Sequence, residues 1–262
     1  MTRALILDCD GVLVDTERAG HLPAFNALFA HLGLPVRWDE ATYARLLKIT
    51  GGKERMRTLL TPEFVATHSL PADLAGQNEM LAAWHKWKTA YYTDLVESGA
   101  LPGRTGIARL AAEALAGGWR VAVASTSAEP AVRANLAAAV GDLAAEIPVY
   151  AGDIVTHKKP APDIYLYALD KVGATTDEAV VLEDSANGVE SAVAAGLETL
   201  VTVSAFTADE DFTGAAAVLE DLGEPGSPAR VLSDPRALVP DGVVTLATLE
   251  AMLRTRTGAA RA

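Results

Sequence analysis

The sequence predicts an α/β protein, with a doubly wound parallel sheet and an inserted α-helical domain. From residue 100 onward, short apolar runs alternate with segments of helical character, the pattern of a parallel sheet whose strands are joined by helices. The runs are nearly continuous in Val, Leu, Ile and Ala, which is typical of strands covered on both faces. Residues 16–93 contain no comparable run, so we expect them to form a separate helical unit.

The core is expected to contain strands that alternate with helices. The predicted strands are Ala4–Leu7, Arg120–Ala124, Pro148–Ala151, Ala179–Leu182 and Thr199–Val203. The predicted helices between and before them are Gly106–Ala116, Pro130–Val140, Pro162–Val172 and Asn187–Ala195. A glycine follows each of these helices, which is a common place for a helix to end. Repetition of this strand and helix unit favours a doubly wound sheet.

The domain borders follow from the same pattern. Residues 1–15 and 94–262 are predicted to form the core, and residues 16–93 a helical cap. The cap helices are expected at Ala19–Leu32, Asp39–Lys48, Lys53–Leu60 and Ala72–Leu95. The chain would pass between the two domains twice, which favours a hinged lid. Residues 255–262 are expected to fray.

Composition excludes several classes of function. The 262 residues carry a formal net charge of -12, with 50% hydrophobic residues, so a nucleic-acid partner is not expected. Cys9 is the single cysteine, which excludes an internal disulfide and favours a reducing compartment. Because we find neither a leader nor an apolar span of about twenty residues, we expect a cytoplasmic protein with no membrane partner. A monomer is expected.

Polar side chains follow four of the predicted strands. They are Asp8 and Asp10 after the first strand, Ser125, Thr126 and Ser127 after the second, Lys159 after the third, and Glu183 and Asp184 after the fourth. Open parallel sheets bind ligands at the carboxyl ends of their strands. Carboxylates crowded at that edge need a counter-charge, and an all-oxygen set favours Mg²⁺ over zinc, which would require clustered His or Cys. Lys159 would balance the remaining charge, and Ser125 with the backbone N–H groups after it would bind phosphate.

The spacing of the first two aspartates suggests a reaction. The Asp8 carboxylate can attack phosphorus and form an aspartyl phosphate. Asp10 is near enough to protonate the leaving oxygen and later to deprotonate water. Cys9 between them is expected to be a small buried hydrophobe.

Four motifs carry a family resemblance. They are Asp8-Cys9-Asp10-Gly11-Val12, the VAVAST run that ends at Ser125-Thr126, Lys159-Pro160 and Glu183-Asp184. In this order they resemble the motifs of the haloacid dehalogenase-like (HAD) phosphatases, whose Rossmann-like core carries an inserted helical cap. Asp10 argues against the dehalogenases themselves, which lack this second aspartate.

Longer stretches resemble the CbbY-type branch of that family. They are DTERAGHLPAFN, LLKITGGKERM, HKWKT, AGDIVTHKKPAPDIY, VVLEDSANGV and FTADEDF. The resemblance implies a Mg²⁺-dependent phosphatase acting on xylulose-1,5-bisphosphate. It further implies these roles: Asp8 as nucleophile, Asp10 as acid/base and carbonyl ligand of the metal, Ser125 and Lys159 as phosphate ligands, and Glu183 and Asp184 as metal ligands. Thr126 is included with the phosphate-binding residues.

The resemblance also assigns residues of the cap to the sugar or its distal phosphate. They are Glu17, His21, Tyr43, Lys53, Arg55 and Lys88. The paired glycines Gly51 and Gly52, before Lys53 at a helix start, can form an anion-binding nest. One departure is Leu22-Pro23, which stands where the group carries a basic residue and so removes a charge from the early cap helix.

Other interpretations stay open from the sequence. His21 can be a packing histidine, and the aromatic residues at helical spacing in the last cap helix can be packing residues. A β-phosphoglucomutase would share the fold, both aspartates and the cap type. A phospho-sugar sensor without turnover is the non-enzyme alternative.

Overall fold

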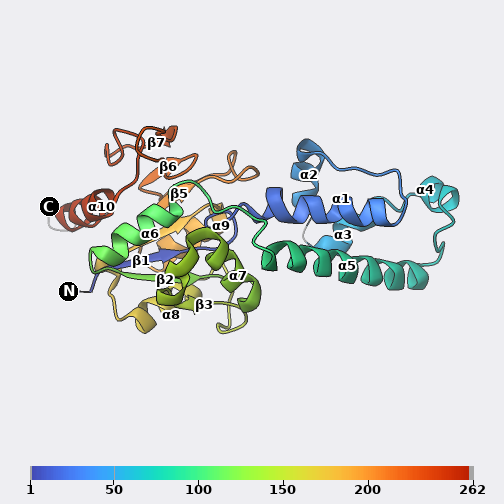
Figure 1. Cartoon of the computed structure of the whole chain (residues 1–262), viewed down its shortest axis with the longest axis horizontal. Helices are drawn as coiled ribbons and strands as arrows, with labels where there is room; N and C mark the ends of the chain where they lie inside the picture. Colours follow the sequence, from blue (N-terminus) through green and yellow to red (C-terminus); the bar gives the residue numbers. More distant parts are fainter. Residues whose placement is uncertain (1, 50, 260–262) are drawn as a thin grey trace. The chain divides into compact units, whose positions relative to one another are not determined.

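The computed structural model describes residues 2–49 and 51–259. The chain divides into two units, shown in Figure 1. The core unit consists of Met1–Thr16 and Gly99–Ala262, and the helical unit of Glu17–Ser98. The ranges expected from the sequence were 1–15 with 94–262 for the core and 16–93 for the cap.

A seven-stranded sheet forms the centre of the core unit, in the order β3-β2-β1-β4-β5-β6-β7. The strands are β1 (Ala4–Leu7), β2 (Arg120–Ala124), β3 (Val149–Tyr150), β4 (Ala179–Glu183), β5 (Glu198–Thr202), β6 (Ala217–Leu219) and β7 (Val231–Ser233). Neighbouring strands run parallel except β6 and β7, which are antiparallel. The order of strands reverses between β1 and β4, so this pair is the topological switch point of the sheet.

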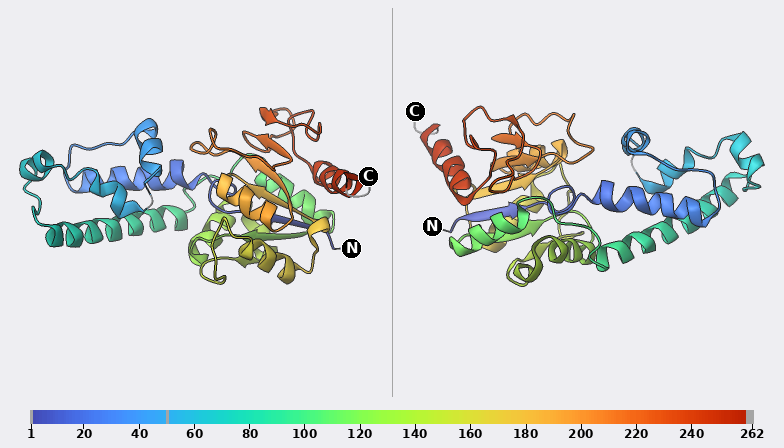
Figure 2. Two further views of the ribbon diagram at one scale, coloured as in Figure 1. Left: turned by 180° about the vertical axis from the view of Figure 1, so that it is seen from behind. Right: turned by 45° about the horizontal axis from the view of Figure 1, so that its top comes forward.

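Helices cover both faces of this sheet (Figures 1 and 2). They are α6 (Ile107–Ala116), α7 (Glu129–Val140), α8 (Asp163–Val172), α9 (Ala186–Ala194) and α10 (Leu246–Ala259), with short 3₁₀ turns at Gly141–Glu146 and Thr176–Glu178. Helices α6, α7 and α10 pack on one face, and α8 and α9 pack on the other. The predicted doubly wound fold is therefore confirmed.

The C-terminal part of the core differs from the sequence expectation. Strands β6 and β7 were not predicted, because three-residue runs next to turns give little periodic signal. Helix α10 continues to Ala259, so the tail expected to fray from residue 255 has helical backbone as far as that residue. Residues 260–262 of the predicted tail lie outside the described residues.

Over residues 17–49 and 51–98, the helical unit contains a π-helical turn at Glu17–His21 and five α-helices. These are α1 (Leu22–His31), α2 (Glu40–Leu47), α3 (Gly52–Arg57), α4 (Pro62–Thr67) and α5 (Leu74–Glu97). The single helix expected at Ala19–Leu32 is thus divided at His21. Pro23 lies in the first turn of α1, where proline is common.

Aromatic side chains form the centre of the helical unit. The ring of Trp38 lies 4.9 Å from that of Phe25 and 4.8 Å from that of Phe29, measured between centroids. Trp84 and Tyr92 of α5 are buried as well, so for these two the packing interpretation holds. Over residues 2–49 and 51–259, no helix combines the length and apolar character that crossing a bilayer requires.

Candidate active site

The acidic residues predicted to share a site do come together at the switch point of the sheet. Asp8 follows β1, and its backbone N–H donates to the carbonyl of Leu182 in β4 at 3.0 Å. Glu183 ends β4, and Asp184 follows it. One carboxylate oxygen from each of Asp8, Glu183 and Asp184 can be chosen so that all three lie within 4.8 Å of one another.

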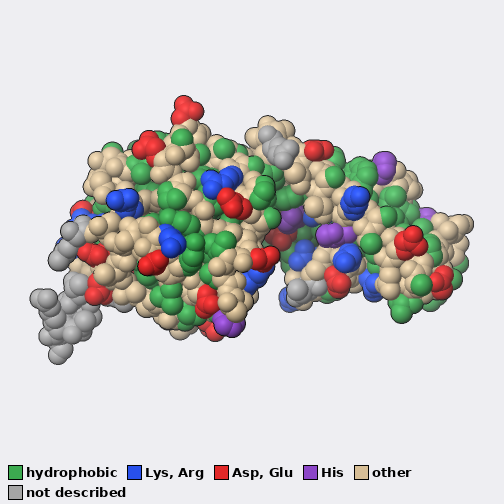
Figure 3. Space-filling view, turned by 90° about the horizontal axis from the view of Figure 1, so that it is seen from below, with side chains coloured by type: hydrophobic (Ala, Val, Ile, Leu, Met, Phe, Trp, Pro, Cys, Tyr) green, Lys and Arg blue, Asp and Glu red, His purple; other side chains and the backbone are tan. Residues whose placement is uncertain are grey.

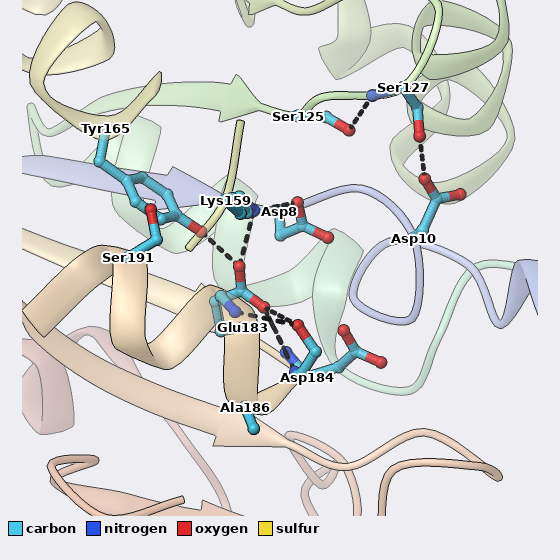
Figure 4. A network of polar contacts seen from close by, with 12 residues as sticks. Asp8, Asp10, Ser125, Ser127, Lys159, Tyr165, Glu183, Asp184, Ala186 and Ser191 are labelled. Carbon is cyan, nitrogen blue, oxygen red and sulfur yellow. Dashed lines mark hydrogen bonds and ion pairs between the residues drawn. The ribbon is translucent and has the colours of Figure 1, made fainter. Parts of the chain in front are cut away.

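Lys159 joins two of these carboxylates (Figure 4). Its ammonium group donates to Asp8 Oδ1 at 2.5 Å and to Glu183 Oε1 at 2.6 Å. Only 11% of the Lys159 side chain is exposed. Burial alone would lower the pKa of Lys159, but the two carboxylates outweigh it and raise the pKa well above its usual value. Lys158, by contrast, pairs with the exposed Asp153 at 2.9 Å.

Glu183 is held by hydrogen bonds on both of its oxygens. Oε1 accepts from Lys159 and, at 2.5 Å, from the hydroxyl of Tyr165. Oε2 accepts from the backbone N–H groups of Asp184 at 3.0 Å and of Ser185 at 3.3 Å. Burial would raise its pKa, but the ion pair with Lys159 and these donors lower it overall. Glu183 is therefore a fixed, charged anchor beneath the start of α9.

Gly188 of α9 makes this position of Glu183 possible. A Cβ atom at residue 188 would lie 1.9 Å from the Glu183 carboxyl carbon, so any side chain there would displace the carboxylate. The glycine is thus required by close packing rather than by a turn.

The charges of the acidic cluster do not balance. Burial raises the pKa of Asp8 to about 7, with Lys159 opposing the rise and Glu183 and Asp10 adding to it. Burial, followed by repulsion from Glu183 and Asp8, raises the pKa of Asp184 well above its usual value. The Lys159 ammonium group pairs with Asp8 and Glu183, and the donor set of the three carboxylates is all oxygen. These residues therefore fit a hard divalent cation.

Asp10 lies beside the hydroxyl groups that follow β2. Ser127 Oγ donates to Asp10 Oδ2 at 2.5 Å, and the Ser127 backbone N–H donates to Ser125 Oγ at 3.2 Å (Figure 4). Ser125 is buried, and Thr126 is half-buried. The loop after β2 thus brings hydroxyl and N–H donors to the edge of the sheet where Asp8 and Asp10 lie.

In the helical unit, three predicted residues form one hydrogen-bonded chain. The hydroxyl of Tyr43 donates to Glu17 Oε2 at 2.6 Å, and Arg55 Nη1 donates to that hydroxyl at 3.2 Å. Burial, followed by the charge of Glu17, raises the pKa of Tyr43, so the phenol stays protonated and can donate.

Lys88 and His21 form a second pair in the helical unit. Lys88 Nζ lies 2.8 Å from His21 Nδ1, and it also lies over the rings of Phe25 and Tyr92, 4.5 Å and 5.3 Å from their centroids. Burial lowers the pKa of Lys88 to about 8. Burial and the nearby cations lower the pKa of His21, so the neutral imidazole accepts the hydrogen bond from the ammonium group.

The glycine pair precedes helix α3, with Gly51 at φ 100°. A Cβ on Gly52 would lie 3.0 Å from the ring of His85, so α5 packs closely against this turn. Lys53 is exposed. Figure 3 shows Lys, Arg and His side chains gathered on one part of the helical unit.

Sequence reasoning missed several residues that shape the site. Tyr165 lies in the quoted AGDIVTHKKPAPDIY stretch but was counted only as part of a helix. Gly188 and His85 lie in the stretches VVLEDSANGV and HKWKT, but they received no role, because their roles depend on side chains that approach from other elements. Arg104, which binds the carbonyl of Gly11, was also missed.

Comparison with known proteins identifies the family. A model of the haloacid dehalogenase-like hydrolases matches residues 2–196. The chain belongs to this hydrolase family. The predicted family, and with it an enzyme of the HAD phosphatase type, are thereby confirmed.

Relatives within the family carry the CbbY name. A CBBY-like protein of Arabidopsis thaliana is 47% identical over 223 residues, which cover 85% of this chain and 70% of that protein. The plasmid-encoded protein CbbY of Cupriavidus necator is 42% identical over 231 residues, covering 86% and 88%.

Solved structures agree with this assignment. CbbY from Rhodobacter sphaeroides in complex with phosphate is 40% identical, with a TM-score of 0.64, and the match covers 84% of this chain and 95% of that one. A mutant of the same protein, in complex with xylulose-(1,5)bisphosphate, is 39% identical with the same TM-score and coverage. A putative β-phosphoglucomutase from Thermotoga maritima, at 22% identity and a TM-score of 0.59 over 98% and 99% of the two chains, shares the fold.

Proposed function

We propose that this HAD-family hydrolase is a Mg²⁺-dependent phosphatase of a small sugar phosphate, with xylulose-1,5-bisphosphate as the leading candidate. The observation that carries the proposal is the cluster of Asp8, Lys159, Glu183 and Asp184 at the switch point, beside Asp10. The choice of substrate is supported by the CbbY structure with xylulose-(1,5)bisphosphate, which is 39% identical over 84% of this chain.

The reaction proceeds in two displacements. In the first, an oxygen of the Asp8 carboxylate forms a bond to phosphorus, the bond from phosphorus to the sugar oxygen breaks, and Asp10 gives that oxygen a proton. In the second, Asp10 takes a proton from water as the water oxygen bonds to phosphorus, and the acyl phosphate bond breaks. Phosphate leaves, and both aspartates return to their starting states. The hydrogen bond from Ser127 orients Asp10.

Asp8 and Asp184 are the residues that would hold the metal, together with the backbone carbonyl of Asp10. A bound Mg²⁺ would supply charge stabilisation to a phosphoryl group at this edge. Glu183, predicted as a ligand, accepts from two donors on Oε1 and from three on Oε2. We therefore assign it first to positioning Lys159 and the start of α9.

Phosphate binding falls to the loop after β2 and to Lys159. The buried hydroxyl of Ser125, with Thr126 and the N–H groups of the loop, offers donors. Lys159 supplies a positive charge that is fixed by two carboxylates, so it needs little rearrangement when a phosphoryl group arrives.

The helical unit is proposed to act as the cap and to recognise the sugar and its distal phosphate. Glu17 and Tyr43 offer polar contacts to hydroxyl groups. Arg55, Lys53 and Lys88 supply positive charge for a second phosphate. The residues from 1 to 15 and from 94 onward are proposed as the catalytic domain. A monomeric, cytoplasmic protein remains a prediction from the sequence.

A phosphate-release assay tests the proposal. Purified protein is incubated with xylulose-1,5-bisphosphate and with pentose, hexose and ketose monophosphates, with Mg²⁺ and in chelated buffer. We expect release that requires Mg²⁺ and is fastest with a ketose phosphate. Full activity in chelated buffer would contradict the metal assignment, and release from none of these sugars would contradict the function.

Two controls accompany the assay. Asp8→Asn should abolish turnover while leaving the protein folded. Turnover is lost because uncatalysed hydrolysis of phosphate monoesters is extremely slow, with enzymatic accelerations up to ~10²¹. Near-wild-type activity in this variant would reject Asp8 as nucleophile. Incubation with β-glucose 1-phosphate and a trace of glucose 1,6-bisphosphate should give free phosphate, whereas glucose 6-phosphate without release would indicate a mutase.

A further inference from the structure

Arg104 lies in the segment that leads back into the core unit after the helical unit. Its guanidinium group is half-buried and donates to four backbone carbonyls. They are those of Gly11, Thr202 at 2.9 Å, Val203 at 2.6 Å and Glu220 at 2.6 Å. One side chain therefore joins the loop after β1 to the carboxyl ends of β5 and β6.

The loop after β1, residues 8–14, contains both catalytic aspartates. We call it the nucleophile loop. Within it, the backbone N–H of Leu13 donates to the carbonyl of Cys9 at 2.9 Å, and that of Gly11 donates to Val14 at 2.8 Å. The carbonyls of Gly11 and Leu13 accept from outside the loop, and both donors belong to Arg104: its guanidinium and, at 2.9 Å, its backbone N–H.

Gly11 is confined on its other side by Asp184. Its φ is +80°, and a Cβ atom there would lie 2.0 Å from Asp184 Oδ2. The residue thus lies against the Asp184 carboxylate and also accepts from the Arg104 guanidinium, and the charges of these two groups attract one another. Movement of Gly11 would change the spacing between the nucleophile loop and Asp184.

We propose that Arg104 is a positioning residue for hydrolysis, which holds the Gly11 carbonyl and so fixes the nucleophile loop against Asp184. This inference rests on the proposed function for its kinetic consequence. Arg104 itself does not touch the reacting atoms. It acts through the backbone that carries Asp8 and Asp10.

The alternative is that Arg104 stabilises the fold only by attaching the C-terminal segment to the core. Arg109 provides a matched control for this alternative. Arg109, in α6, donates to the carbonyls of Gly223 at 2.7 Å and Val244 at 2.8 Å, and pairs with Glu113 and Glu224. It thus makes a similar number of buried contacts to the same part of the chain. The contacts that the structure gives it do not include the nucleophile loop.

The test compares Arg104→Met, Arg104→Lys and Arg109→Met. With p-nitrophenyl phosphate as the probe, we expect kcat of Arg104→Met to fall roughly ten- to hundredfold, the range for loss of a hydrogen bond to a charged group, while KM changes less than about threefold. Arg104→Lys keeps the positive charge, so its kcat should lie between those of the wild type and Arg104→Met. Arg109→Met should lower the melting temperature about as much as Arg104→Met does. Unlike Arg104→Met, it should leave kcat within about twofold of the wild type.

A second measurement does not depend on turnover. Isothermal titration of the metal-free proteins with Mg²⁺ alone should show at least about tenfold weaker binding for Arg104→Met and near-wild-type binding for Arg109→Met, since only the first variant loosens Gly11 beside Asp184. If the wild type hydrolyses no phosphate ester, the proposed function fails while this titration still decides the role of Arg104. Equal losses in the two Met variants, or wild-type kcat and Mg²⁺ binding in Arg104→Met, would overturn the inference.

Discussion

The stability of a Lys88→Met variant relative to the wild type should depend on pH, and it should be higher at neutral pH than at alkaline pH. The Lys88 side chain is 6% exposed, and burial lowers its pKa from 10.5 to about 8. The folded chain therefore binds this proton less tightly than the unfolded chain does. Below pH 8, Lys88 is charged in both states and folding carries the whole cost of the buried charge. The cost decreases as the pH rises through 8 and disappears near 10.5.

The size of the effect follows from the two pKa values. A tenfold change in proton affinity corresponds to about 1.4 kcal/mol, so the shift from 10.5 to about 8 corresponds to roughly 3 kcal/mol at pH 6.5. At pH 9.5 the unfolded chain still gains from protonation, while the folded chain is largely neutral at this residue. At pH 9.5 the cost of burying the Lys88 charge is therefore reduced to roughly 1 kcal/mol.

Urea unfolding followed by tryptophan fluorescence measures this difference. The unfolding free energy of Lys88→Met minus that of the wild type should fall by about 2 kcal/mol between pH 6.5 and pH 9.5. Lys86→Met is the matched control, because Lys86 lies on the same helix with an exposed side chain. The Lys88→Met difference should vary with pH more than the Lys86→Met difference does. A Lys88→Met difference that stays constant over this range would refute the reasoning.

Two further variants test the anchoring of Glu183. Tyr165→Phe keeps the ring, whose centroid lies 4.7 Å from Lys159 Nζ, but removes the hydroxyl that donates to Glu183 at 2.5 Å. The free energy of unfolding measured in urea should fall by about 1–3 kcal/mol. Unchanged stability would show that this hydrogen bond is dispensable. Gly188→Ala places a Cβ 1.9 Å from the Glu183 carboxyl carbon and should lower the melting temperature and the rate of phosphate release. In Gly173→Ala, where φ is +67° but no atom lies within 4 Å, only the backbone cost of about 1–2 kcal/mol is expected. Equal effects of the two Ala variants would contradict the packing argument.

The sheet could be predicted where its strands are continuous apolar runs. Strands β1 and β2 begin and end where the sequence indicated, since their side chains are buried almost throughout. Strands β6 and β7 could not be predicted, because a three-residue strand is too short to show an alternating hydrophobic pattern, and its conformation depends on pairing with the neighbouring strand. The break at His21 was missed for a related reason: a π-helical turn followed by an α-helix keeps an apolar pattern close to that of a single helix.

The candidate site was predictable as far as strand ends determine it. Asp8 and Glu183 were expected together, because parallel strands bring their carboxyl ends to the same edge. The hydrogen bonds that saturate Glu183 were not predictable, since they require the positions of Tyr165 and α9 in space. Arg104 lies 93 residues from Gly11 in sequence, and no local pattern links a guanidinium group to so distant a carbonyl.

The position of β1 in the sheet also affects how the chain folds as it is synthesised. This strand pairs with β2, which begins at Arg120, and with β4, which begins at Ala179. At ~5–20 residues per second, a ribosome needs roughly 6 to 20 seconds to add the first of these partners after β1. During that interval the apolar tetrapeptide Ala4–Leu7 has no strand partner, and synthesis of Glu17–Ser98 is completed before the first partner appears. The segment that carries the nucleophile is therefore made before the strands that flank it, and it can join the sheet only after they have been synthesised.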